Sequence, residues 1–201
     1  MEEIVNDLAE RNRRWIEEEG GIEGPTHLET LMQPEQQKRI EWLKLHCQSK
    51  SILDIGCNWG WVLSQVDGQC GVDINPNNIA LARERFPERQ FSVGDVTGGL
   101  GFSGGSFDTV IEADLLEHLD WFDGVEKALK EGIRIARGRL LVTLPWRRDN
   151  KCALCFKHHW LVTEDSISRI GMWLMAHCQS VSYDCDGNFI YLEALLRRTD
   201  V

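Results

Sequence analysis

The sequence contains no long run of lysine and arginine, no extended apolar stretch, no internal repeat and no low-complexity segment. With a formal net charge of −10, a broad surface for nucleic acid or for an anionic membrane is not expected. No segment approaches the roughly 18 apolar residues that a membrane-spanning helix needs. The first residues, 1–4, are too acidic for a secretory signal peptide. These absences argue against a membrane, secreted or nucleic-acid-coating protein.

The cysteine content and the size of the chain suggest a single cytoplasmic domain. Seven cysteines, an odd number, lie mostly in apolar or motif segments, which favours reduced thiols over disulfides. At 201 residues and 42% hydrophobic composition, the chain can bury one sizeable core. We therefore expect one domain over 1–201, with a helical flank or lid over 1–48 and an α/β core over 49–201.

From residue 51 onward, strand patterns alternate with helical patterns. Strands are predicted at 51–55, 70–74, 91–95, 107–112, 138–145, about 179–185 and about 188–197. Helices are predicted over 2–19, 34–47, 60–66 and 164–176, and others begin near Pro76 and Asp123. Asp186-Gly187 between the last two strands predicts a hairpin. The fold class is therefore α/β: a doubly wound, mostly parallel seven-stranded sheet with an antiparallel C-terminal hairpin strand.

Two neighbouring segments carry the strongest functional signal. The segment 51–60 (SILDIGCNWG) is a short β-branched run that ends in an acid and a glycine-rich turn. The segment 70–76 (CGVDINP) ends a second run in Asp73, nineteen positions after Asp54. This is the spacing of a nucleoside-binding βαβ unit, in which the second acid accepts hydrogen bonds from ribose hydroxyls.

The chemistry of the turn separates two kinds of nucleoside cofactor. Asp54 precedes the first glycine, and Asn58 stands where a dinucleotide motif would have its second glycine. Asparagine tolerates left-handed backbone angles, so we expect the turn to form. An acid there would repel a pyrophosphate but suits a ligand that carries an ammonium and a sulfonium. A third acid, Asp95, follows another predicted strand and can accept a hydrogen bond from an adenine amino group.

Over essentially its whole length the chain resembles the class I S-adenosylmethionine-dependent methyltransferases, a Rossmann-like family. Each matching segment is weak alone, but the five occur in the family's order and spacing. They are 54–60, 71–74, 94–96, 107–118 and 138–145. The resemblance implies S-adenosylmethionine as cofactor and S-adenosylhomocysteine as product. It also implies that the first motif surrounds the methionine moiety, with Asp54, Gly56, Cys57, Asn58 and Gly60.

The remaining cofactor contacts are carried over from the same resemblance. Asp73 would hold both ribose hydroxyls, and Ile74 would lie against the adenine. Asp95 would bind the adenine amino group, while the Val96 amide would face a ring nitrogen. The backbone near Ala113 would meet the methionine amino group.

Methyl transfer needs a base only when the acceptor starts protonated, and two clusters could supply one. Asp114, Glu117 and His118 are spaced to face one way on a helical turn, and His159 follows the fifth strand. The arrangement resembles the divalent metal site of small-RNA 3′-end ribose methyltransferases, with Asp114 in the place of their glutamate. We favour His118 or His159 as base or substrate contact, with Asp114 beside them, over a metal held by these four residues. The other alternative is that Glu117 and His118 only tie the helix to a neighbouring loop.

A substrate wall is a further possibility. Trp59, Trp61 and Trp146 could enclose a planar acceptor, with Arg147 or Arg148 binding an anionic group. The alternative is that the tryptophans pack under the N-terminal helices and the arginines are solvated.

We therefore predict a methyltransferase that acts on oxygen or nitrogen of a small molecule, as a monomer or homodimer without membrane contact. The alternatives are methylation of RNA or protein, which the acidity disfavours, and a non-catalytic module that only binds the cofactor.

Overall fold

The computed structural model describes residues 33–49, 51–121, 123–146 and 162–197, and the account below is confined to them. The strands are β1 (Ile52–Ile55), β2 (Cys70–Asp73), β3 (Gln90–Val93), β4 (Phe107–Ala113), β5 (Ala136–Pro145), β6 (Ser180–Cys185) and β7 (Phe189–Leu195). The helices are α3 (Pro34–His46), α4 (Trp61–Gln65), α5 (Pro76–Arg85), α6 (Asp123–Ile135) and α7 (Glu164–His177). Two 3-10 turns are η2 (Val96–Gly98) and η3 (Leu116–His118). The predicted helix over 2–19 lies outside the described residues.

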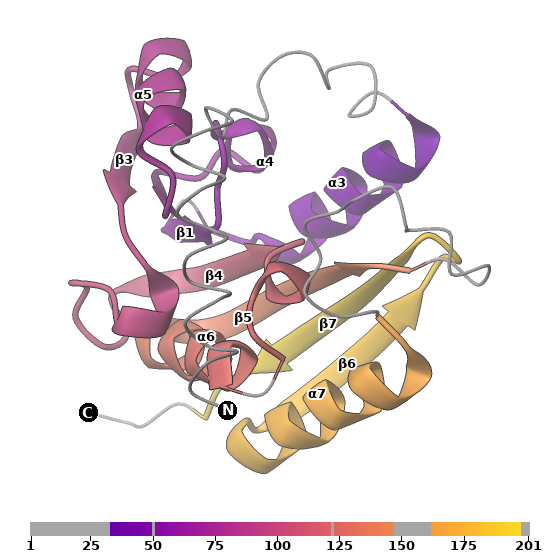
Figure 1. Ribbon diagram of the computed structural model, residues 1–201. Helices are drawn as coiled ribbons and strands as arrows, with labels where there is room; N and C mark the ends of the chain where they lie inside the picture. The colour runs from indigo at the N-terminus through magenta and orange to yellow at the C-terminus, as the bar shows by residue number, and fades with distance from the viewer. Residues whose placement is uncertain (1–32, 50, 122, 147–161, 198–201) are drawn as a thin grey trace.

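All seven strands form one sheet in the order β3-β2-β1-β4-β5-β7-β6 (Figure 1). Strands β1 to β5 pair in parallel, whereas β7 runs antiparallel to both β5 and β6. The predicted doubly wound sheet with an antiparallel C-terminal hairpin is therefore confirmed. The chain winds outward in one direction from β1 and in the other from β4. Open sheets of this kind bind ligands outside the carboxyl ends of the strands at such a switch point.

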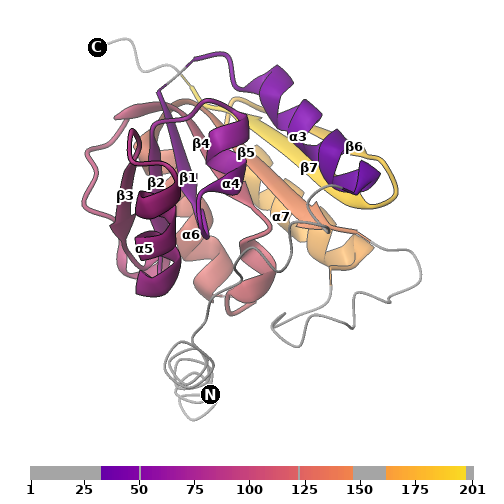
Figure 2. The same ribbon diagram turned by 90° about the horizontal axis from the view of Figure 1, so that it is seen from above.

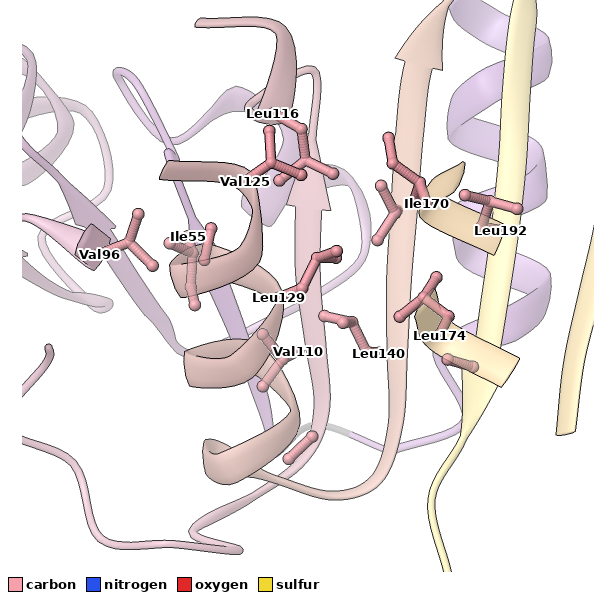
Figure 3. Packing of buried hydrophobic residues seen from close by; sticks show 14 of the residues in the cluster. Ile55, Val96, Val110, Leu116, Val125, Leu129, Leu140, Ile170, Leu174 and Leu192 are labelled. Atoms are coloured by element: carbon pink, nitrogen blue, oxygen red, sulfur yellow. The ribbon is translucent and has the colours of Figure 1, made fainter. Parts of the chain in front are cut away.

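Helices cover both faces of the sheet. Figure 1 shows α3, α4 and α5 above the sheet and α6 and α7 below it, and Figure 2 gives the view from above. Neighbouring residues of β4 enter opposite cores because side chains alternate along a strand. Val110 packs with Leu129 of α6 (Figure 3), while Ile111 packs with Leu43 of α3.

The central strand β5 shows the same division. Leu140, Val142 and Leu144 join the core beneath α6 and α7, and Leu141 joins the core beneath α3. All four side chains are fully buried. This explains why the strand appears in the sequence as a continuous apolar run rather than an alternating one.

Helix α5 begins at Pro76, where the sequence predicted a helix start. The Asn75 side chain accepts a hydrogen bond from the amide of Asn77 at 2.9 Å, and Pro76 occupies the first helical position. Ile79 and Ala82 on the inner face of α5 are fully buried. Capping fixes where α5 leaves the end of β2, next to the predicted ribose site.

Within the described ranges, no helix is both long and apolar enough to cross a membrane. The five cysteines in these ranges are free thiols: Cys47, Cys57, Cys70, Cys178 and Cys185.

Candidate active site

A tight turn after β1 brings its backbone to the end of β2. The amide of Gly56 donates to the carbonyl of Val72 at 2.8 Å, and the amide of Cys57 donates to the same carbonyl at 2.9 Å. Gly56, Asn58 and Gly60 have φ angles of 76°, 50° and 84°. The expectation that Asn58 adopts a left-handed conformation is thus confirmed. The left-handed φ of Gly56 favours glycine, and a Cβ there would also lie 2.9 Å from Leu115 Cδ1, which would have to move.

Asp54, at the end of β1, lies under this turn and is only 1% exposed. Its Oδ2 has no hydrogen-bond partner among the described residues. Burial raises the pKa of Asp54 to about 8, and the charge of Arg39 opposes this effect. A buried carboxylate with one oxygen unused is a suitable partner for a ligand ammonium. The adjacent Cys57 is buried in the core beneath α4 and α5, so it contributes its backbone to the turn.

Asp73, the last residue of β2, joins the turn to the start of α5. Its Oδ2 accepts from the amide of Asn58 at 2.8 Å, and its Oδ1 accepts from the amide of Asn75 at 2.8 Å. The residue is 9% exposed. An ionised carboxylate offers about four acceptor positions. The Nδ2 of Asn78 also donates to the Oδ1 of Asp73 at 3.5 Å, so Asp73 ties the turn after β1 to the start of α5.

The predicted adenine contacts lie at the ends of β2 and β3. Asp95 is exposed, and its Oδ1 accepts from the amide and the hydroxyl of Thr97 at 2.8 and 2.7 Å. Val96, the first residue of η2, is buried. Ile74, directly after β2, is 47% exposed. A large apolar side chain left open at a strand end suits a flat apolar ring.

Asp114 follows Ala113 at the end of β4 and has a left-handed φ of 52°. Thr143 of β5 donates to its Oδ1 at 2.9 Å, and Arg39 of α3 donates to its Oδ2. The Arg39 guanidinium lies 5.1 Å from the centre of the Phe189 ring. The side chains of Arg39 and Asp114 are 5% and 26% exposed. Asp114 is thus the more accessible member of a buried ion pair that ties α3 to the sheet.

Sequence reasoning missed Arg39, which lies 75 positions before its partner. A local signal exists, because Arg39 precedes Leu43 by four positions and therefore lies on the buried face of α3. A charge within the apolar face of a helix needs a buried counter-charge.

The expected grouping of Asp114, Glu117 and His118 on a helical turn is wrong. Asp114 is left-handed, and Leu116–His118 form a 3-10 turn, so helical spacing does not apply. Glu117 is fully buried, and its pKa is raised well above the ordinary value by burial and then by the charge of Asp114. The described residues contain no group of three or more His, Cys, Asp or Glu side chains that could hold a metal. His159 lies outside the described residues.

Of the tryptophans proposed as a substrate wall, Trp59 is 4% exposed, and the Arg85 guanidinium lies 4.9 Å from the centre of its ring. Trp59 is therefore a core residue. Trp61 packs against the core beneath α3 and α4, and Trp146 lines a groove of about 1100 Å³ between α7 and β6. Residues 147–148, the two arginines, lie outside the described residues.

These features define a Rossmann-like α/β protein with acids at three adjacent strand ends. Residues 53–141 match a family model described as a methyltransferase domain. A possible histamine N-methyltransferase from Thermotoga maritima has a similar structure, with a TM-score of 0.66, 16% identity, and coverage of 98% of this chain and 100% of that chain. Magnesium protoporphyrin IX methyltransferase from Synechocystis, solved with bound S-adenosylhomocysteine, is also similar in structure. Its TM-score is 0.57 at 18% identity, and the match covers 80% of this chain and 81% of that chain. At these identities the likeness shows the fold.

A sequence relative is the 18S rRNA (guanine(1575)-N(7))-methyltransferase of Saccharomyces cerevisiae, 32% identical over 101 residues. The match covers 48% of this chain and 36% of the yeast protein, so it spans about a third of that relative. These comparisons show that residues 53–141, a little under half of the chain, are similar to a methyltransferase domain.

Proposed function

We propose that this protein transfers the methyl group of S-adenosylmethionine to an oxygen or nitrogen atom of a small molecule. The observation that carries the proposal is the order of three carboxylates along one edge of the sheet. Strands β3, β2 and β1 are neighbours, and Asp95, Asp73 and Asp54 lie at or just after their carboxyl ends. One ligand lying across these ends would place adenine by Asp95, ribose by Asp73 and the amino acid by Asp54.

The chemistry of each position suits that part of the cofactor. Asp54 has a buried oxygen with no partner among the described residues, which an ammonium would satisfy. The turn backbone from Gly56 to Gly60 is held in left-handed conformations at three of its residues, which aims its amides away from the regular strand path. The exposed face of Ile74 offers an apolar surface for the adenine ring. The residues present therefore fit the cofactor.

When bound, S-adenosylmethionine supplies a methyl group made electrophilic by its sulfonium. The chain's own contribution is to hold the acceptor in line with that group and to exclude water. Asp114 is placed to accept a hydrogen bond from the acceptor's hydroxyl or amine. His118, which is partly exposed in η3, is the described candidate to take the acceptor's proton. His159 is the second candidate from the sequence.

Two observations favour a small-molecule acceptor. The net charge of −10 opposes a long polyanionic substrate. Two proteins of similar fold are named for small-molecule acceptors, one as a possible histamine N-methyltransferase and one as magnesium protoporphyrin IX methyltransferase. The alternative is an RNA acceptor, which the name of the yeast relative favours.

The test is transfer of label from methyl-tritiated S-adenosylmethionine into a cell extract, which is then fractionated into small molecules, RNA and protein. With wild-type protein we expect label in the small molecules. The label should be absent with Asp73→Ala and retained with the control Asp108→Ala, which changes a residue at the opposite end of β4. Label in RNA or protein would refute the acceptor class. Cofactor binding without transfer to any fraction would instead indicate a binding module.

A further inference from the structure

Arg39 is a buried cation surrounded by carboxylates. It donates to Asp114, and its charge also lowers the pKa values of Asp54 and Glu117 against the larger effect of burial. The residue is 4% exposed, and its Nε has no hydrogen-bond partner among the described residues. Together with the unpartnered Oδ2 of Asp54, this leaves both a buried donor and a buried acceptor at the same end of the sheet.

The strand order locates this cluster relative to the cofactor of the proposed function. If ribose lies at the end of β2 and the ammonium at the end of β1, then the sulfur that joins them lies between these two strand ends. Strand β4 is the neighbour of β1 on the other side, and Asp114 follows it directly. The ion pair of Arg39 and Asp114 therefore lies at the strand end next to the one that would hold the amino-acid part of the cofactor, near enough for its charges to act on the sulfonium.

Charge is the property that changes at this place during the reaction. S-adenosylmethionine carries a positive sulfonium, whereas S-adenosylhomocysteine has a neutral thioether in its place. A fixed charge nearby changes the affinity for the first ligand and leaves the affinity for the second almost unaltered. Asp114 alone would favour the cationic donor, and Arg39 alone would disfavour it.

We propose that the ion pair of Arg39 and Asp114 sets the ratio of affinities for the cationic methyl donor and the neutral product. Asp114 attracts the sulfonium, and Arg39 offsets that attraction so that donor and product bind with comparable strength and exchange. The inference rests on the proposed function, since it needs the cofactor to lie across β2 and β1.

The test is calorimetric titration of the protein with S-adenosylmethionine and with S-adenosylhomocysteine. Arg39→Met leaves an uncompensated anion, so the preference for the donor should rise roughly tenfold. Asp114→Asn, which keeps the side chain's shape, should lower it by a similar factor. The double variant removes both charges and should return the ratio to within about twofold of wild type.

The matched control is the ion pair of Arg137 and Asp108, 2.8 Å apart and exposed near the amino end of β4. Arg137→Met and Asp108→Asn should leave the ratio unchanged. If Arg39→Met fails to fold, Asp114→Asn and the double variant still decide the question. Binding of both ligands with a ratio unaltered by Asp114→Asn would overturn the inference alone. Wild-type protein that binds neither ligand would overturn the proposed function and the inference with it.

Discussion

Glu112 is a carboxylic acid enclosed in the hydrophobic core, and replacing it should change how stability depends on pH. It lies in β4 and is fully buried, and neither carboxylate oxygen has a hydrogen-bond partner among the described residues. Helix α6 covers it so closely that a Cβ on Gly132 would lie 2.5 Å from its Oε1. Burial alone raises the pKa of Glu112 from the ordinary 4.5 to about 8.

The sign and size of the effect follow from proton linkage. Because the folded protein holds this proton to higher pH than the unfolded chain does, stability falls as pH rises from about 4.5 to about 8. At pH 7 the folded protein has lost about 3 kcal/mol of stability. Each unit by which the pH exceeds the ordinary pKa of 4.5 costs about 1.4 kcal/mol, up to the raised pKa. Asp54, whose pKa is also raised to about 8 by burial, adds a similar dependence that Glu112→Gln leaves in place.

The assay is urea unfolding of wild type and Glu112→Gln at pH 5, 6, 7 and 8. Glutamine does not titrate, so stability of the variant relative to wild type should rise by about 3 kcal/mol across this range. The buried amide adds a constant cost that does not vary with pH. Glu126→Gln on the exposed face of α6 is the control. Its free energy of unfolding should change with pH in the same way as that of wild type. Parallel curves for Glu112→Gln would refute the burial of an unpaired acid at this position.

Three further predictions concern the site and the core. Asp73→Ala should weaken binding of S-adenosylhomocysteine by about 1–3 kcal/mol, as measured by calorimetry, because a charged hydrogen-bond partner is lost; unchanged affinity would contradict the ribose assignment. Gly132→Ala should lower the unfolding free energy by about 1–3 kcal/mol, since its methyl group would collide with Glu112 and Leu140; a wild-type urea midpoint would argue against the packing. Methyl transfer should continue in EDTA, because Asp114 already accepts hydrogen bonds from two side chains; loss of activity restored by Mg²⁺ would require a metal.

Local patterns predicted the elements of the fold because each depends on neighbours in sequence. The cap at Asn75 and the proline after it define the start of α5. The apolar run of β5 indicates burial on both faces, and Asp186-Gly187 places the final hairpin. Periodicity likewise located α7, which was predicted over 164–176 and runs from Glu164 to His177.

The parts that sequence reasoning missed depend on contacts between distant segments. Nothing near Asp114 indicates that Arg39 binds it, since α3 reaches β4 only after the sheet has formed. Glu112 lies in a strand that resembles any other, and only the packing of α6 shows that its carboxylate is buried. The left-handed backbone at Asp114 also escaped prediction, and it breaks the helical spacing expected from Asp114 to His118.

The most direct test of the account is a crystal structure of the protein with S-adenosylhomocysteine. We expect the ligand at the carboxyl ends of β1 and β2, with adenine on Ile74, ribose hydroxyls on Asp73 and the amino group on Asp54. Density for the ligand elsewhere, or in the reversed orientation along these strand ends, would contradict the proposed site.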